Sequence, residues 1–254
     1  MNISFNELVL NFRKLGLSKG DTILVHSSYK SFGGIEGGPQ TVIDAIKSIL
    51  TNDGTLIVPT FNYDFCSGVP FDIKKTPSKM GIISELVRLD VDSKRTQDPV
   101  FSFGVIGKHR DYLTNLISEH SFGSDSIFAK LRELNAKIMI IGLTYNESMT
   151  FFHHVEEIHG CDYRYFKEFT GNFKNYDNSE KNIKIIIFVR DLKRGVKNAV
   201  NKMGSILEKE GIVKNIMIGK SEIKIMNVNA VFDKTTEEMI KNPHILIQIE
   251  NTKE

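Results

Sequence analysis

One segment constrains the fold more than any other: an apolar run at 23–25, a glycine-rich loop, and then a helical pattern. Pro39 suits the first position of a helix, and apolar residues follow it at helical spacing. A strand, a flexible loop and a helix N-terminus together can hold a phosphate group. The spacing of the four glycines matches neither the dinucleotide-binding nor the P-loop fingerprint, so an ordinary glycine-rich turn remains an equal alternative. The glycines are Gly33, Gly34, Gly37 and Gly38.

Other apolar runs and helical patterns alternate along the chain. Runs with the length of buried strands lie at 54–59, 137–143 and 184–189. Helical patterns lie at 3–15, 81–89, 126–134 and 196–210. Buried strands that alternate with helices form sheets that are covered on both faces. The sequence therefore predicts a layered α/β/α fold with a mostly buried central sheet, as a single domain over 1–254.

Two segments lack such patterns. Residues 60–80 contain several aromatic side chains, and a loop of this length inside a domain is usually functional. Residues 172–182 are polar, which predicts a loop or a subdomain boundary near 171–183.

Composition excludes several classes of protein. The 254 residues are 41% hydrophobic, with 33 Lys and Arg against 31 Asp and Glu, and no basic and aromatic stripe indicates nucleic-acid binding. No apolar window has the length of a membrane span, and the first residues do not resemble a signal peptide. Cys66 and Cys161 have no metal-type spacing and no activating context. We expect a cytoplasmic protein that binds no metal, no membrane and no nucleic acid.

A set of short motifs covers roughly residues 5–165. They are Val25-His-Ser-Ser28 with Gly33 and Ile35-Glu-Gly-Gly38, Gly54-Thr-Leu-Ile-Val-Pro-Thr60, Pro70-Phe-Asp72 with Thr76-Pro-Ser78 and Met80-Gly81, and Phe122-Gly-Ser-Asp-Ser126, Ile140-Ile-Gly142 and Met149-Thr-Phe-Phe-His153-His-Val-Glu156. In combination they resemble the aminoglycoside 3-N-acetyltransferase family, whose members move an acetyl group from acetyl-CoA to a sugar amine. The resemblance implies the layered α/β fold of this family, acetyl-CoA as the co-substrate and, by analogy, a homodimer.

The resemblance also assigns a catalytic residue. His153 matches the catalytic histidine of the family, and its imidazole suits a general base at neutral pH. If the stretch is helical, Glu156 lies one turn further on and can orient the ring. Without the resemblance, a buried structural histidine would be the better interpretation.

The matching loops supply candidate binding residues. Ser27 and Ser28 follow the first strand, where the CoA pyrophosphate is expected beside Gly33, and Thr76 and Ser102 are weaker candidates for CoA contacts. A nucleophilic role is not indicated for either serine of the pair, because no base lies beside them in the sequence.

Two other features bear on specificity and on alternatives. The family usually has His-Pro before a Ser-Phe pair, but this chain has Asp98-Pro99 there, which leaves the acceptor open. His154, Glu157 and His159 do not match the His-Glu-x-x-His motif of metalloproteases, so metal hydrolysis is a remote alternative.

The charge balance favours one acceptor class. A polycationic aminoglycoside needs a carboxylate-rich site, but this chain is slightly basic. We therefore expect a nucleotide-linked amino-deoxy sugar, such as a dTDP-linked 3- or 4-amino-dideoxy hexose of bacterial surface-glycan synthesis. Tyr63 is the candidate for stacking, and Asp64 and Asp72 for binding the amine. The alternatives are an aminoglycoside 3-N-acetyltransferase that confers antibiotic resistance and a CoA- or sugar-binding module without catalysis.

Overall fold

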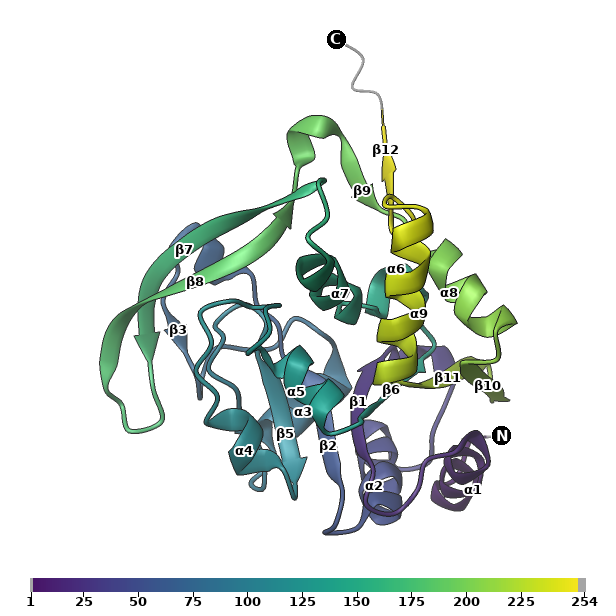
Figure 1. Cartoon of the computed structure of the whole chain (residues 1–254). Coiled ribbons are helices and arrows are strands. Elements are labelled where there is room, and N and C mark those ends of the chain that lie inside the picture. Colours follow the sequence, from purple (N-terminus) through teal and green to yellow (C-terminus); the bar gives the residue numbers. More distant parts are fainter. Residues whose placement is uncertain (1, 251–254) are drawn as a thin grey trace.

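A computed structural model describes residues 2–250, and its centre is a seven-stranded mixed sheet (Figure 1). The strand order is β10-β11-β6-β1-β2-β5-β4, and β1 pairs in parallel with both β2 and β6. The strands are β1 (Thr22–Ser27), β2 (Thr55–Pro59), β4 (Lys94–Arg95), β5 (Phe103–Gly107), β6 (Lys137–Ile141), β10 (Val213–Ile218) and β11 (Ser221–Asn227). The predicted strands at 23–25, 54–59 and 137–143 are confirmed as β1, β2 and β6.

Helices cover both faces of this sheet, as predicted. Val25 points into the hydrophobic cluster on one face, called the first face, and Leu24 into the cluster on the second face, because successive strand residues face opposite sides. The first face is covered by α1 (Phe5–Leu15), α2 (Pro39–Leu50) and α3 (Ile82–Leu89). The second is covered by α5 (Ile127–Glu133), α7 (Phe151–His159), α8 (Asn201–Lys209) and α9 (Val228–Lys241). Short helical turns are η1 (Tyr29–Phe32), η2 (Asp64–Ser67), α4 (Arg110–Thr114), α6 (Tyr145–Ser148) and η3 (Leu192–Arg194).

A long hairpin lies over the second face and carries a small sheet of its own (Figure 1). It consists of β7 (Arg164–Lys174) and β8 (Glu180–Arg190), and β3 (Phe71–Asp72) pairs with β7. The predicted strand at 184–189 therefore belongs to the hairpin and not to the central sheet. The loop predicted at 172–182, near the boundary considered at 171–183, consists of the paired ends of both hairpin strands and the turn that joins them.

The last predicted helix also needs correction. Residues 196–198 form β9 (Val196–Asn198), which pairs with β12 (Ile247–Ile249), and α8 begins only at Asn201. Backbone pairing with a strand some 50 residues away in sequence overrides the local pattern here. Among residues 2–250, no helix is long and apolar enough to cross a membrane.

The sheet topology marks one edge for ligand binding. The carboxyl ends of β1, β2 and β6 lie at the same edge, because these strands are parallel. The chain leaves β1 towards α2 on one face and leaves β6 towards α7 on the other. Ligands of open α/β sheets bind at such a switch point, here between Ser27 and Gly142.

Candidate active site

His153 lies in the first turn of α7, which follows β6 and the short helix α6 along the chain. The helix ends at Gly160, whose left-handed backbone (φ 74°) closes the last turn. Helical spacing places Glu156 under the imidazole, with Nδ1 of His153 2.7 Å from Oε2 of Glu156. The predicted geometry of the pair is thus present. In the tautomer with Nδ1 protonated, this nitrogen donates to the carboxylate, and Nε2 carries the lone pair that can accept a proton.

Glu156 is almost fully buried but well compensated. Tyr163 donates its hydroxyl to Oε1 at 3.0 Å, and Nε of Arg164 lies 2.8 Å from Oε2. Burial alone would raise the pKa of Glu156, but the Arg164 charge and the bond from His153 outweigh it, so that this pKa is lowered. Glu156 is therefore a carboxylate at neutral pH, which is the form that can hold and orient the His153 ring.

The pKa of His153 is also shifted. Burial lowers it below 6.5, and the Arg164 guanidinium, 2.9 Å from Nδ1, lowers it further. The interaction with Glu156 opposes this shift but does not cancel it. Most molecules consequently carry a neutral imidazole at pH 7, ready to act as a base.

A pocket of about 330 Å³ opens over His153, and we call it the acceptor pocket. Phe122 packs edge-on against the His153 ring at 5.3 Å, and Phe101 packs on Phe122 at 4.6 Å. Arg164, Arg190 and the neutral His153 line the pocket, and none of the carboxylates of residues 2–250 does. The complete lining is Tyr63, Phe101, Phe122, Thr150, His153, Arg164, Ile187, Phe188, Val189, Arg190, Leu192 and Asn198.

The predicted CoA residues of the first loop lie at the switch point. Ser27 and Ser28 are partly exposed at the end of β1, and the Ser28 amide donates to the carbonyl of Ile141 at the end of β6. Gly33 ends η1 with a left-handed backbone (φ 86°), and Ile3 pairs with the glycine-rich loop through Gly34 and Glu36. One side of this loop is thus closed by the N-terminal segment.

The other two predicted CoA residues contribute to the surroundings of Arg95. Ser102 is fully buried, and its hydroxyl accepts a bond from Nε of Arg95 at 2.9 Å. Thr76 accepts from the same guanidinium through its carbonyl oxygen at 2.5 Å. Since the Ser102 hydroxyl is enclosed, the geometry gives it a supporting role around Arg95 and not a direct contact with CoA.

Of the predicted acceptor residues, only Tyr63 lines the acceptor pocket. The carboxylate of Asp64 pairs with Lys79 at 2.5 Å on the surface. Asp72 accepts bonds from the amides of Lys74 and Lys75 and so closes a local turn. These two carboxylates are therefore engaged outside the pocket.

Other groups near His153 have structural roles. His154 points into the core, where Nδ1 lies 2.7 Å from the carbonyl oxygen of Phe122. Within residues 2–250, no group of three or more His, Cys, Asp or Glu side chains is arranged to hold a metal ion. Burial raises the pKa of Cys66 to about 11 and of Cys161 to about 12, so both thiols are protonated at neutral pH and are poor nucleophiles.

Sequence reasoning missed Tyr163, Arg164 and Arg190. Arg164 begins β7 and Arg190 ends β8, and the register pairs them directly. Nothing in the local sequence distinguishes them from other residues of the hairpin. Only the return of the chain over α7 brings them to His153.

A comparison with known families settles the relationship. The model of the family described as aminoglycoside 3-N-acetyltransferase matches residues 24–240. The chain belongs to this family. A curated relative, the SPbeta prophage-derived aminoglycoside N(3')-acetyltransferase-like protein YokD of Bacillus subtilis (strain 168), is 31% identical over 169 residues, which cover 58% of this chain and 62% of YokD. Aminoglycoside N(3)-acetyltransferase VIII of Streptomyces fradiae is 26% identical over 183 residues, or 61% of this chain and 60% of the relative. The matched part thus spans about three fifths of these relatives.

Solved structures of family members share the fold. The complex of AAC-IIIb with CoASH aligns with a TM-score of 0.84 at 19% identity, covering 95% of this chain and 97% of that one. Sisomicin-bound AAC-VIa aligns with a TM-score of 0.83 at 20% identity, covering 94% and 98%. The likeness extends over nearly the whole chain and confirms the predicted fold.

Proposed function

We propose that this protein is an acetyl-CoA-dependent N-acetyltransferase whose acceptor is an amino sugar of the aminoglycoside class. The observation that carries the proposal is the neutral His153, held by Glu156 and opening on the acceptor pocket. Membership of the family supports the reaction class, and the relatives that are named as aminoglycoside acetyltransferases support the acceptor class.

Acetyl transfer then proceeds directly. Nε2 of His153 removes a proton from the acceptor nitrogen as that nitrogen attacks the thioester carbonyl of acetyl-CoA. The C–N bond forms, the C–S bond breaks, and the CoA thiolate leaves and takes up a proton. The buried Glu156 carboxylate stabilises the imidazolium that forms on His153. Since Cys66 and Cys161 are protonated, no acyl-enzyme step is part of this mechanism.

The fold supports a place for the co-substrate at one edge of the central sheet. The switch point offers the side-chain hydroxyls of Ser27 and Ser28 at the same edge of the sheet as α7. CoA phosphates at this edge would place the thioester towards His153. The binary complex of AAC-IIIb with CoASH, a structure of the same fold, supports this choice of co-substrate.

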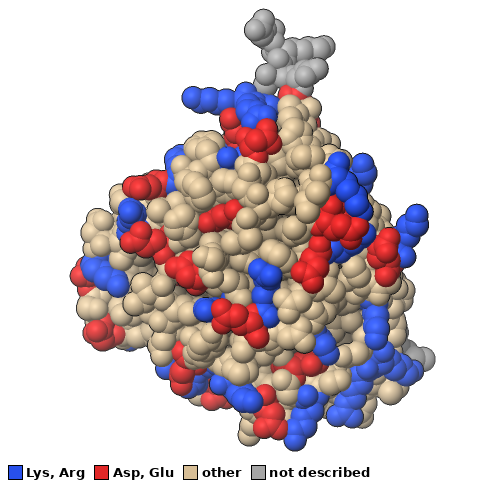
Figure 2. Space-filling view, in the orientation of Figure 1, with Lys and Arg blue, Asp and Glu red and all other residues tan. Residues whose placement is uncertain are grey.

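The charge of the site supports a second acceptor class. Arg190 lines the acceptor pocket and none of the carboxylates in the described part of the chain does, which suits an acceptor that carries an anion, such as a nucleotide-linked amino-deoxy sugar. Figure 2 shows acidic and basic side chains interspersed on one face of the molecule, so neither sign of charge dominates that face. The names of the relatives favour the aminoglycoside, so the nucleotide-linked sugar is the second candidate.

The test is CoA release from acetyl-CoA, followed with a thiol reagent, with a panel of aminoglycosides and a panel of nucleotide-linked 3- and 4-amino sugars. We expect turnover with aminoglycosides. Turnover confined to nucleotide-linked sugars would support the second candidate, and no turnover with any amine would contradict the proposed activity.

A further inference from the structure

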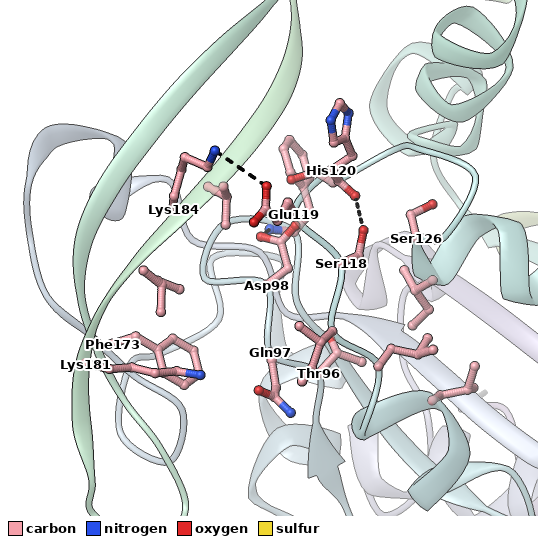
Figure 3. Close-up of a pocket in the computed structure, with 18 of the residues that line it drawn as sticks. Thr96, Gln97, Asp98, Ser118, Glu119, His120, Ser126, Phe173, Lys181 and Lys184 are labelled. Carbon is pink, nitrogen blue, oxygen red and sulfur yellow. Dashed lines mark hydrogen bonds and ion pairs between the residues drawn. The ribbon is translucent and has the colours of Figure 1, made fainter.

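A cavity of about 340 Å³ lies between the hairpin and the body of the molecule, and the mechanism above does not use it (Figure 3). Strand β8 forms one wall through the consecutive residues 181–185, and the segments 96–98 and 116–121 form the opposite wall. Successive residues of a strand face opposite sides of its sheet, so a strand that lines a cavity with every residue presents its edge to that cavity. We call this space the hairpin cavity.

The edge of β8 carries unpaired backbone groups in the cavity. The amide of Ile186 donates to the carbonyl oxygen of Glu119 at 2.7 Å, and the amide of Ser121 donates to the carbonyl oxygen of Ile186 at 3.0 Å. The backbone groups of Ile186 therefore point away from β7. Because this direction repeats at every second residue, the N–H and C=O groups of Asn182 and Lys184 point the same way. No other backbone group of residues 2–250 hydrogen-bonds with them, so the edge is open at these two residues.

The open edge of β8 is not protected against pairing with another strand. Charged side chains are a common protection of strand edges. The ammonium of Lys184, however, lies 3.5 Å from Glu119 and 3.8 Å from Glu168, so its charge is compensated. The opposite wall includes the apolar side chains of Leu116 and Ile127. A row of backbone hydrogen-bonding groups beside an apolar wall is the arrangement that binds an extended peptide by strand addition.

The two ends of the cavity differ in charge and in access. Ser121 closes one end, because its amide pairs with β8, and its hydroxyl bonds to the carboxyl group of Asp98. Figure 3 shows Asp98 and Glu119 at this end and Lys181 at the other. Asp98 and Lys181 form no ion pair within the described part of the chain. Since Lys181 is exposed, the cavity opens to solvent at the lysine end.

These ends set the direction in which a peptide can bind. A peptide that enters beside Lys181 and pairs with β8 must end at Asp98, since Ser121 occupies the next position on the strand edge. If the peptide ran parallel to β8, it would bring a C-terminal carboxylate to the carboxyl groups of Asp98 and Glu119, and like charges repel. If it runs antiparallel, it brings a free ammonium group there and leaves past Lys181, which favours an acidic side chain.

We propose that the hairpin cavity binds the free N-terminus of a partner polypeptide, whose first residues add to β8 as an antiparallel strand with their ammonium group beside Asp98. The span from Asn182 to Lys184 allows about three residues of the partner to pair. Backbone hydrogen bonds supply the affinity in such strand addition, and the apolar wall selects the side chains. This site goes beyond acetyl transfer and does not depend on it.

A pool of pentapeptides with free amino termini tests the proposal. Their first three positions are random, the last two are Glu, and a fluorescent dye is attached at the C-terminus. We expect saturable binding of selected peptides by fluorescence polarisation, and acetylation of the peptide amine should raise Kd roughly tenfold or more. Asp98→Asn should weaken binding of the free-amine peptides and leave the acetylated peptides unaffected.

Amide hydrogen exchange locates the bound peptide on β8. In the free protein the amides of Asn182 and Lys184 should exchange fast, and a saturating peptide should slow them roughly tenfold or more. The amides of Ile183 and Ile185 face β7 in the ladder and should not change. Peptide binding that leaves the exchange of Asn182 and Lys184 unaltered would contradict strand addition.

The matched variants are Lys184→Pro and Lys184→Ala. Both remove the charged side chain, but only proline removes the outward N–H group, and an edge strand tolerates this because that group does not pair with β7. We expect Lys184→Pro to abolish peptide binding and Lys184→Ala to keep Kd within a few-fold of the wild-type value.

Equal affinities of the two variants, or no binding of any peptide to the wild-type protein, would overturn the proposal. The exchange measurement needs no variant, so it decides the matter if Lys184→Pro does not fold. CoA release by the wild-type protein tests the proposed acetyl transfer separately.

Discussion

At the scale of single residues, the site depends on a buried charge arrangement around one imidazole. Burial is the largest cause of the lowered pKa of His153, Arg164 and Arg190 lower this pKa further, and Glu156 raises it. The opposing effects leave an imidazole that is neutral at pH 7, which is the protonation state that the proposed general base requires. The protonation state of His153 can therefore be changed in either direction by altering one neighbour.

Two variants should shift the His153 pKa in opposite directions. In the wild-type protein His153 should titrate below pH 6.5, with the base form lost as pH falls through its pKa. Glu156→Gln should lower that pKa, because the stabilising carboxylate is lost, and Arg190→Gln should raise it. NMR titration of the imidazole ring checks this. A wild-type value above 7, or shifts of the same sign in both variants, would contradict the electrostatic account.

The sequence predicted part of this arrangement. The pair of His153 and Glu156 lies one helical turn apart, so local periodicity was enough to place them together. Arg164 reaches them only because the chain reverses at Gly160 and β7 returns over α7. Contacts that depend on a chain reversal leave no pattern in the local sequence. The position of Arg190 beside His153 could not be predicted for the same reason.

At the scale of elements, Arg95 connects the strands and loops beside the site. Its guanidinium donates to the side chains of Thr60 and Ser102 and to the carbonyl of Thr76, and it lies 4.6 Å from the ring centre of Phe71. Burial lowers the pKa of Arg95 to about 10, so it remains charged at neutral pH. One side chain thus ties β2, the start of β5 and the irregular segment 60–80 together.

Replacing Arg95 by lysine should show this role. The single ammonium group cannot satisfy the several acceptors that a planar guanidinium reaches. We expect Arg95→Lys to lower the free energy of unfolding by about 3 kcal/mol, measured by urea denaturation. Lys94→Arg, at the partly exposed neighbouring position, keeps the positive charge that pairs with Asp111, so it is the control and should have little effect. If Arg95→Lys lowers the free energy of unfolding no more than Lys94→Arg does, the hydrogen bonds of Arg95 do not stabilise the loops.

The strands that sequence reasoning placed wrongly are also explained at this scale. The apolar run at 184–189 has the composition of a central strand, but it packs its buried residues Ile185, Ile187 and Phe188 against the second hydrophobic face from outside the sheet. Composition indicates burial, and it does not indicate in which sheet a strand pairs.

At the scale of the whole molecule, two buried histidines couple stability to pH. His26 is 5% exposed on β1, and His154 is fully buried on α7. Burial lowers the pKa of each to about 4 from a usual value of 6.5. The unfolded chain therefore binds protons at these positions between pH 6.5 and 4, where the folded protein does not, and stability falls as pH falls through this range.

The expected effect is measurable. Between pH 7 and pH 5, each histidine should lower the free energy of unfolding by about 2 kcal/mol. The raised pKa values of Asp98 and Glu157 offset part of this loss, because these carboxyls bind protons more readily in the folded protein. Thermal unfolding at pH 7, 6 and 5 measures it. The Tm should drop steadily, and His154→Asn should show a shallower drop than the wild-type protein. A Tm that stays constant or rises towards pH 5 would contradict this linkage.

The most direct test of the central claim is the effect of His153→Ala on acetyl transfer. With the acceptor on which the wild-type protein is most active, kcat measured by CoA release should fall roughly 100-fold or more, while affinity for CoA stays within a few-fold. His159→Ala, on the same helix but outside the acceptor pocket, should retain wild-type activity. If His153→Ala turns over acetyl-CoA and amine at the wild-type rate, His153 is not the base.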